Sequence, residues 1–331
     1  MALLTFGSGG LGGGAGSQSN QYVVYNKMGF LTILRAELVF EPWCKDGSLP
    51  TGMGSDTARW FRYADLAADT TELIEGQNPT EDLITNPTQI DVRIKQFGSF
   101  IKVSDKLDLM KISGTQEQFR DILARKATLS MDNLIQTESL TTSTIIRAGG
   151  QANSSLDGPA AGSVTTAGLR DIARIRGKAR VLNAKPHSAT PGGRFFGLIV
   201  DPEVSFDIMS DAAAVGGQAN VFWLDISKYI DKGSILEGSP GAVMGVAFKE
   251  TTLIDTVTDT AQVVFRNLVF ADEGIGCLKL SGKSGIEIIN KKSGPNDTSN
   301  ALNMFQTYGY KFWTAYKLLD SNRLFRFLSL S

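Results

Sequence analysis

The side chains that most often carry catalysis or bind metals are scarce in this chain. Its 331 residues include one histidine, His187, in a Lys-Pro-His-Ser segment, and two distant cysteines, Cys44 and Cys277. A Ser-His-Asp or Cys-His mechanism would depend on His187, yet no nucleophile-elbow pattern surrounds it. One histidine and two distant cysteines also lack the spacing of a zinc site. We therefore expect no catalytic residue, no metal site, and two free thiols in a reducing compartment.

Two glycine-containing segments partly match nucleotide-binding motifs. Residues 7–12 satisfy G-x-G-x-x-G, a pattern that binds a dinucleotide where it joins a strand to a helix. Here further glycines and then polar residues follow up to Asn20, which is typical of a flexible arm. Gly282-Lys283-Ser284 resembles the end of a Walker A loop, but Cys277 occupies the place of its first glycine. We predict no cofactor; an enzyme that uses the glycine-rich segment for a nucleotide is kept as an alternative.

Charged residues cluster in two places. Glu72, Glu75, Glu81 and Asp82 lie in a segment without basic residues. We interpret this segment as a solvated loop, because a general acid needs burial or a close partner to shift its pKa.

The second cluster is basic. Arg170, Arg174 and Lys178 recur every four residues and would share one face of a helix. Two interpretations stay open: contact with phosphate or with an acidic surface, such as the acidic loop of a neighbouring subunit, or a solvated helix face.

Composition limits the class of protein. The chain is 42% hydrophobic and 20% charged, with a formal net charge of -1. These values are typical of a globular protein, and the length suggests about two domains. No apolar run reaches the roughly 18 residues of a membrane span, and the overall basic excess of a dedicated nucleic-acid binder is missing. We expect no membrane partner.

The elements expected to organise the molecule are two strands at 58–63 and 88–103 that flank the acidic segment. Both alternate apolar and polar residues, and a phase slip is expected near Gly98. An isolated two-stranded ribbon is at best marginally stable in water, so we expect a neighbouring subunit to cover it. The candidate interface residues are Trp60, Phe61, Tyr63, Ile90, Val92 and Ile94.

A long helix is predicted next. Thr115 and Gln118 form a capping-box pattern, and apolar residues then recur at helical spacing up to about Ile146. We expect this helix to act as a spine. Glycine and proline indicate a loop at 41–56, and residues 148–165 are predicted to be a flexible link at a domain boundary.

The rest of the chain mixes helices and strands without a regular βαβ repeat. Helices are expected at 166–183 and after Pro202, and strands at 195–200, 241–250 and 261–270. Alternation from Tyr308 to Leu318, a turn at 320–322 and a strand from Arg323 to Leu330 predict a C-terminal hairpin that packs on the spine helix. This mixture favours an α+β fold.

Several segments, in order, resemble the N4-type family of tailed-phage major capsid proteins. They are ARWFRYADL, LIEGQNPTEDLI, IDVRIKQFGSFIKVSDKLDL, FGLIVDPEVSFDIMSD, SPGAVMGVAFKETT and SGPNDTSNALNMFQTYGYKFWTAYKLLD. Together they cover most of the chain between residues 30 and 320. Where such proteins often have Asp-Pro-Leu, this chain has Asp297-Thr298-Ser299.

The resemblance implies the Hong Kong 97-like capsid fold. It would divide the chain into a flexible glycine-rich N-terminal arm (1–30), a peripheral-domain entry segment (31–56), an extended-loop hairpin (57–104), a peripheral domain with the spine helix (105–150), an axial domain (151–275) and a return to the peripheral domain with a C-terminal hairpin (276–331).

The implied function is self-assembly into the icosahedral shell of a tailed double-stranded DNA bacteriophage, without enzymatic activity. The implied partners are further copies in hexamers and pentamers, a portal protein at one vertex, scaffolding or decoration proteins, and non-specific double-stranded DNA on the inner face. Assembly would take place in the host bacterial cytoplasm, and the product would be the virion capsid. A cellular nanocompartment shell of the same fold is the main alternative.

Overall fold

The computed structural model places all its described elements in one compact unit, Leu38–Ser331. It describes residues 39–50, 54–63, 66–73, 75–76, 78, 81–84, 86–104, 106, 115–149, 155–160, 162–188, 190, 195–214, 223–224, 241–259, 262–280, 287–291 and 304–330. The glycine-rich arm, the segment 22–38, the Walker-like segment 282–284 and residues 297–299 lie outside the described residues.

A five-stranded sheet is built around the longest strand, β14 (Phe305–Leu318). Strands β12 (Ile275–Leu280) and β13 (Glu287–Lys291) pair with successive parts of β14, and β4 (Lys95–Ser104) pairs with residues 305–314. Strand β1 (Cys44–Leu49) extends the sheet by pairing parallel to β12. The prediction of a loop over 41–56 is therefore wrong for β1 and for the short 3-10 helix η2 (Glu41–Trp43) before it.

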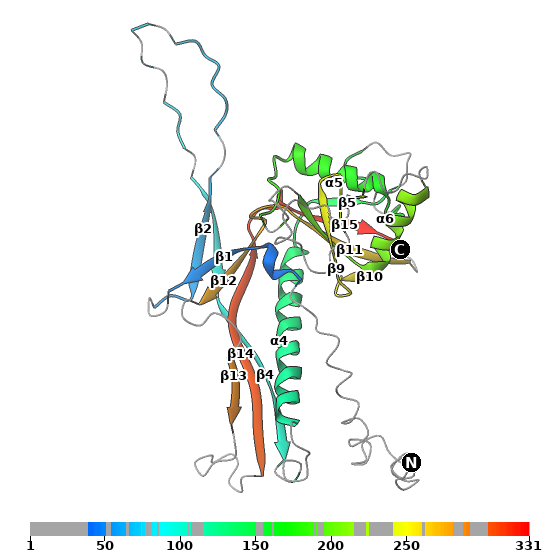
Figure 1. Ribbon diagram of the computed structural model, residues 1–331. Coiled ribbons are helices and arrows are strands. Elements are labelled where there is room, and N and C mark those ends of the chain that lie inside the picture. Colours follow the sequence, from blue (N-terminus) through cyan, green and yellow to red (C-terminus); the bar gives the residue numbers. More distant parts are fainter. Residues whose placement is uncertain are drawn as a thin grey trace. The chain divides into compact units, whose positions relative to one another are not determined.

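Helix α4 (Thr115–Ser139) packs on this sheet, as predicted for the spine (Figure 1). Its 25 residues span about 37 Å at 1.5 Å per residue. One cluster joins the apolar stripe of the helix to alternate residues of the strands, with buried members Leu123, Ala127, Met131, Val103, Tyr308, Tyr310 and Phe312. The expected packing of the C-terminal strand 308–318 on the spine helix is confirmed.

The helix ends at Ser139, and not near Ile146 as predicted. Beyond it, hydroxyl groups bond to a neighbouring segment: Thr142 Oγ1 donates to the Leu324 carbonyl at 2.6 Å, and Thr144 Oγ1 to the Ser321 carbonyl at 2.7 Å. Residues Ile145–Arg147 then form strand β5. Threonine and isoleucine favour strands, and side-chain bonds of this kind compete with helix formation.

An eight-stranded sheet contains most of the remaining strands. Its order is β5, β15 (Leu324–Ser329), β11 (Gln262–Phe270), β6 (Phe196–Val200), β9 (Val246–Glu250), β8 (Ala242–Val243) and β7 (Trp223–Leu224), with β10 (Thr256–Asp259) also paired to β11. Helices α5 (Leu169–Val181) and α6 (Pro202–Ala214) contribute Ile172, Ile175, Val204 and Ile208 to its core. The α+β prediction is confirmed.

The two C-terminal strands do not form the predicted hairpin. The turn after Asp320 is present, but β14 and β15 belong to different sheets. Both edges of β14 are occupied, one by β12 and β13 and the other by β4, while β15 pairs with β11 and β5. A strand can pair on only two sides, so β15 pairs elsewhere.

The predicted flexible link is ordered where it begins. Ala148 and Gly149 are buried. The Ala148 amide donates to the Leu328 carbonyl at 2.7 Å, and its carbonyl accepts from the Thr165 amide at 3.1 Å. These bonds continue the edge of the eight-stranded sheet.

Trp43 is a central side chain of the largest core. It is 1% exposed, and its ring stacks on Phe270 with centroids 5.9 Å apart. A Cβ atom at Gly197 would lie 2.0 Å from the indole, so this position in β6 requires glycine. Because β1 starts at the next residue, Trp43 links the five-stranded sheet to the core of the eight-stranded sheet.

A buried carboxylate of α4 holds the segment that leads into Trp43. Asp132 is almost fully buried, and its carboxylate oxygens accept hydrogen bonds from the amides of Val39 at 3.1 Å and Phe40 at 3.4 Å. Burial raises the pKa of Asp132 to about 6, although the two amide bonds oppose the shift. The ionised form is thus costly to keep inside, and the carboxyl group takes up a proton more readily in the folded chain.

We expect Asp132 to make the subunit more stable on acidification. The carboxyl group of Asp132 binds its proton as the pH falls through about 6 in the folded chain, but only near pH 4 in the unfolded chain. This difference in pKa raises the free energy of unfolding at low pH by roughly 3 kcal/mol. This stabilisation is complete below about pH 4 and is lost as the pH rises through 6. Denaturant unfolding of the wild type and Asp132→Asn across this range measures it, because other carboxylates cancel in the difference. A constant difference between the two proteins would contradict the prediction.

Candidate intersubunit surface

The hairpin of β2 (Thr57–Arg62) and β3 (Thr88–Arg93) has one covered and one exposed face. Ala58, Trp60, Ile90, Val92 and Ile94 pack with residues of the five-stranded sheet, namely Leu49, Leu278, Leu280 and Ala315. Val92 is only 3% exposed in the single chain. The expectation that another subunit must cover this face is therefore wrong, since the same chain covers it.

Trp60 packs the hairpin against the five-stranded sheet. Its indole lies over two glycines of adjacent strands: a Cβ atom would lie 2.7 Å from the ring at Gly47 and 3.1 Å at Gly276. Here glycine leaves space on the sheet for the hairpin, which explains how Gly47 occurs within a strand. Arg62 adds an ion pair to Asp320 at 2.9 Å.

The phase slip predicted near Gly98 occurs at Ile94. The chain leaves the hairpin at Ile94, between β3 and β4, and residues 95–104 belong to the five-stranded sheet. Gly98 continues the ladder without a break opposite Lys311. A Cβ atom there would lie 2.6 Å from the Tyr310 carbonyl oxygen, so the glycine permits close strand approach.

The exposed face of the hairpin carries aromatic side chains and ion pairs. Phe61 is 53% and Tyr63 63% exposed. Arg59 binds Asp91 opposite it through two bonds of 2.5 and 2.9 Å, and Arg93 binds Asp56 at 2.5 Å. These hydrogen bonds lower the pKa values of Asp91 and Asp56. An intersubunit role for Phe61 and Tyr63 stays a prediction.

A long loop joins β2 to β3 (Figure 1). Its described residues combine exposed acidic and exposed apolar side chains. The predicted acidic residues Glu72, Glu75, Glu81 and Asp82 are all exposed. Large apolar side chains that were not predicted as site residues lie beside them: Leu66, Leu73, Leu83 and Ile84 are exposed as well. Their signal is a set of leucine and isoleucine residues within an acidic, proline-containing segment. Such grouped exposure typically marks an interaction surface.

The basic stripe on α5 is not a uniform exposed face. Arg170 is exposed, but Arg174 is buried, paired with Asp171 and bonded to the Gly149 carbonyl at 2.6 Å. Lys178 binds Asp157 at 2.6 Å. Burial raises the pKa of Asp171, against the effects of its amide bonds and Arg174. The three bases therefore do not form one exposed helix face, because tertiary contacts occupy two of them.

His187 and Cys277 are buried, and Cys44 is partly buried. The His187 ring is 4.9 Å from Trp43, its Nε2 atom is 3.1 Å from the Trp43 carbonyl oxygen, and burial lowers its pKa. Both cysteines are free thiols. Burial raises the pKa of Cys277 to about 11 and also raises that of Cys44, so neither has the thiolate character of a nucleophile.

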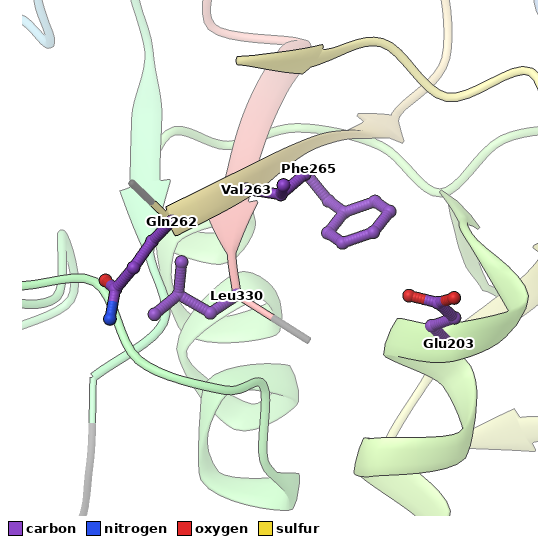
Figure 2. A pocket seen from close by; sticks show the side chains of 5 residues that line it. All are labelled: Glu203, Gln262, Val263, Phe265 and Leu330. Atoms are coloured by element: carbon purple, nitrogen blue, oxygen red, sulfur yellow. The ribbon is translucent and has the colours of Figure 1, made fainter. Parts of the chain in front are cut away.

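A pocket of about 360 Å³ lies between α6 and the ends of β11 and β15 (Figure 2). It is lined by Glu203, Gln262, Val263, Phe265 and Leu330, and the ring of Phe265 points toward Glu203. This lining offers one carboxylate without a second titratable group, so it lacks an acid–base pair. The described residues contain no group of three metal-ligating side chains. In this part of the chain, no helix is both long and apolar enough to cross a bilayer.

Sequence comparison finds no similar protein, whereas structural comparison finds proteins of similar fold. No protein-family model matches the chain, and no curated protein gives a significant match. The capsid of Ralstonia phage GP4 is similar with a TM-score of 0.67 at 13% identity, over 90% of this chain and 92% of that one. The capsid of cyanophage P-SCSP1u gives 0.60 at 14% identity over 89% of both chains. The capsid of cyanophage Pam1 gives 0.59 at 12% identity, over 90% of this chain and 93% of that one. The chain therefore has the Hong Kong 97-like fold of phage capsid proteins.

Proposed function

We propose that this chain is the major capsid protein of a tailed double-stranded DNA bacteriophage, which self-assembles into an icosahedral shell around the genome. The observation that carries the proposal is the similarity to phage capsid structures over about nine-tenths of both chains. An exposed loop rich in apolar side chains supports it, because a subunit that assembles must leave such surface free for its neighbours.

The finer assignment follows the resemblance to the N4-type family. We propose that the five-stranded sheet with α4 is the peripheral domain, that the eight-stranded sheet with α5 and α6 is mainly the axial domain, and that the β2–β3 hairpin with its connecting segment is the extended loop. The observed contacts support these groupings, since one core cluster lies entirely between α4 and the five-stranded sheet. The largest cluster is centred on the eight-stranded sheet and also includes Ile275, Cys277 and Tyr316 of the five-stranded sheet.

The extended loop is proposed to lie against the next subunit. Phe61, Tyr63 and the exposed leucines would be buried there, at about 25 cal/mol per Å² of apolar surface removed from water. Contacts of this head-to-tail type close into rings when the rotation permits, which suits hexamers and pentamers. The exposed acidic residues have Arg170 of a neighbour as a chemically suitable partner, whereas Arg174 and Lys178 are already paired.

Further partners are proposed on the same basis: a portal protein at one vertex, scaffolding or decoration proteins, and double-stranded DNA at the inner face. Because the net charge of the chain is -1, contacts with DNA should be few and independent of sequence. Assembly is placed in the host bacterial cytoplasm.

Electron microscopy of the purified chain, with size-exclusion chromatography and light scattering, tests the proposal. We expect rings of five or six subunits or closed shells, either from the chain alone or with its scaffold and portal supplied. A chain that stays monomeric with both supplied would contradict the proposal. Particles isolated with a cargo protein in place of long DNA would favour the nanocompartment alternative.

A further inference from the structure

Three arginines converge on one face of the eight-stranded sheet. They lie on three adjacent strands: Arg147 on β5, Arg326 on β15 and Arg266 on β11. Leu328 of β15 pairs with Arg147 on one side and with Arg266 on the other. Arg326 lies two residues from Leu328 on the same strand. Paired residues and residues two apart share a face, so the three side chains surround Leu328 on one side of the sheet.

The strand spacing brings these side chains within reach of one another. Neighbouring strands lie about 4.8 Å apart, and diagonal neighbours in a sheet about 7–8 Å apart. Arg326 is therefore a diagonal neighbour of both other arginines. An arginine side chain is long enough for the three guanidinium groups to contact one common ligand.

The cluster has more positive charge than its surroundings neutralise. Asp255 pairs with Arg266, and it is the one acidic residue joined to the cluster in the part of the chain that the structure describes. The Nε atoms of Arg266 and Arg326 are buried without a hydrogen-bond partner among those residues. Burial lowers the pKa of Arg326, and the charges of Arg266 and Arg147 lower it further.

We propose that Arg147, Arg266 and Arg326 form a binding site for a phosphate oxyanion. Guanidinium groups bind tetrahedral and planar oxyanions through paired, charge-assisted hydrogen bonds, and they are the preferred side chains for phosphate. Three arginines and Asp255 leave an excess of two positive charges. This excess attracts free phosphate, since a phosphate group with a second ionisable proton carries about -1.5 to -2 near pH 7, and it also attracts the singly charged phosphodiesters of a DNA backbone. The Arg266 side chain is 28% exposed, so the site is reachable but partly shielded from water.

Two sources share this chemistry: free inorganic phosphate and the backbone of duplex DNA. The DNA source depends on the proposed function, since only a genome-enclosing shell holds DNA against this chain. The site for free phosphate does not depend on it. The two hypotheses can therefore fail separately.

Isothermal titration of the full chain with sodium phosphate at constant ionic strength tests the site. We expect saturable binding by the wild type, and binding weaker by about tenfold or more in Arg326→Gln and in Arg147→Gln, because a charge-assisted bond is lost. Arg180→Gln is the matched control, since Arg180 is exposed on α5, outside the cluster. Absence of binding, or equal binding by all four proteins, would overturn the proposal.

The variants are suited to this test because removing one arginine relieves repulsion within the cluster. We expect the melting temperature of Arg326→Gln without phosphate to equal or exceed that of the wild type. If Arg326→Gln did not fold, Arg147→Gln on the edge strand would provide the same comparison.

A short DNA duplex then distinguishes the sources. If the DNA backbone is the ligand, duplex competes with phosphate, and the slope of log affinity against log salt is smaller by about one in Arg326→Gln. If phosphate binds without competition, the site serves the free ion. An acidic peptide of residues 66–84 that binds the cluster while phosphate does not would overturn the proposal and identify a contact between copies of the chain.

Discussion

Replacing Trp43 by alanine is expected to lower the free energy of unfolding of the isolated subunit by about 3–5 kcal/mol. The indole is 1% exposed, stacks on Phe270 and lies against Gly197 and His187. Its removal leaves a cavity where η2 meets β6 and β11, and the surrounding strands are too constrained to fill it. Urea unfolding of the unassembled chain gives the value.

Phe206→Ala is the matched control, because it also removes an aromatic ring but from an exposed position on α6. We expect this change to stay within about 0.5 kcal/mol of the wild type. The bond between His187 and the Trp43 backbone carbonyl is retained in Trp43→Ala, so the loss measures packing. A loss below about 1 kcal/mol would mean that Trp43 does not link the two sheets as described.

An aspartate on the covered face of the hairpin should destabilise the subunit, whereas an aspartate on the exposed face should leave its stability unchanged. Val92→Asp introduces a charge into the cluster with Leu49 and Leu278, which we expect to cost at least about 3 kcal/mol or to detach the hairpin. Phe61→Asp changes an exposed side chain and should leave unfolding within about 0.5 kcal/mol of the wild type. Hydrogen exchange of the β2 and β3 amides, together with urea unfolding, separates the two outcomes.

Assembly provides the second measurement on the same pair. We expect Phe61→Asp to fold normally and to yield few shells by light scattering and electron microscopy, because a charge replaces an aromatic contact between subunits. Normal assembly of Phe61→Asp would remove Phe61 from the interface. Equal destabilisation by both variants would show that the two faces are assigned wrongly.

The hairpin shows why the sequence could predict a surface but not its partner. Alternation placed Ile90, Val92 and Ile94 on one side, and the structure confirms that they share the covered face. Alternation says nothing about what covers a face, and the covering residues Leu49 and Leu278 are distant in the chain. Gly47 suggested a loop because glycine is rare within strands. Its place in β1 is explained by the Trp60 indole that lies over it, a contact that the sequence does not show.

The charged residues show the same limit. The spacing of Arg170, Arg174 and Lys178 predicted a basic stripe, but Asp171, Asp157 and the Gly149 carbonyl occupy two of the three. The arginine cluster of β5, β15 and β11 had no sequence signal, because its members are 60 or more residues apart in the chain. Only strand pairing brings them together. Ion pairs depend on three-dimensional distance, which local spacing determines only within a helix or strand.

The sequence by itself determined the spine helix with its apolar stripe, the alternating strand β14, the α+β class and, through the order of its segments, the capsid fold. The helix, the strand and the α+β class depend on periodicity, which neighbouring residues encode, whereas the capsid fold was implied by the resemblance of the ordered segments to a phage capsid family. Three features were decided only by the tertiary structure: the residue at which α4 ends, the pairing of β15 in a different sheet from β14, and the hairpin face that is covered. Each of these depends on a competition between distant segments for the same backbone groups or the same apolar surface, and the outcome is set when the chain is folded.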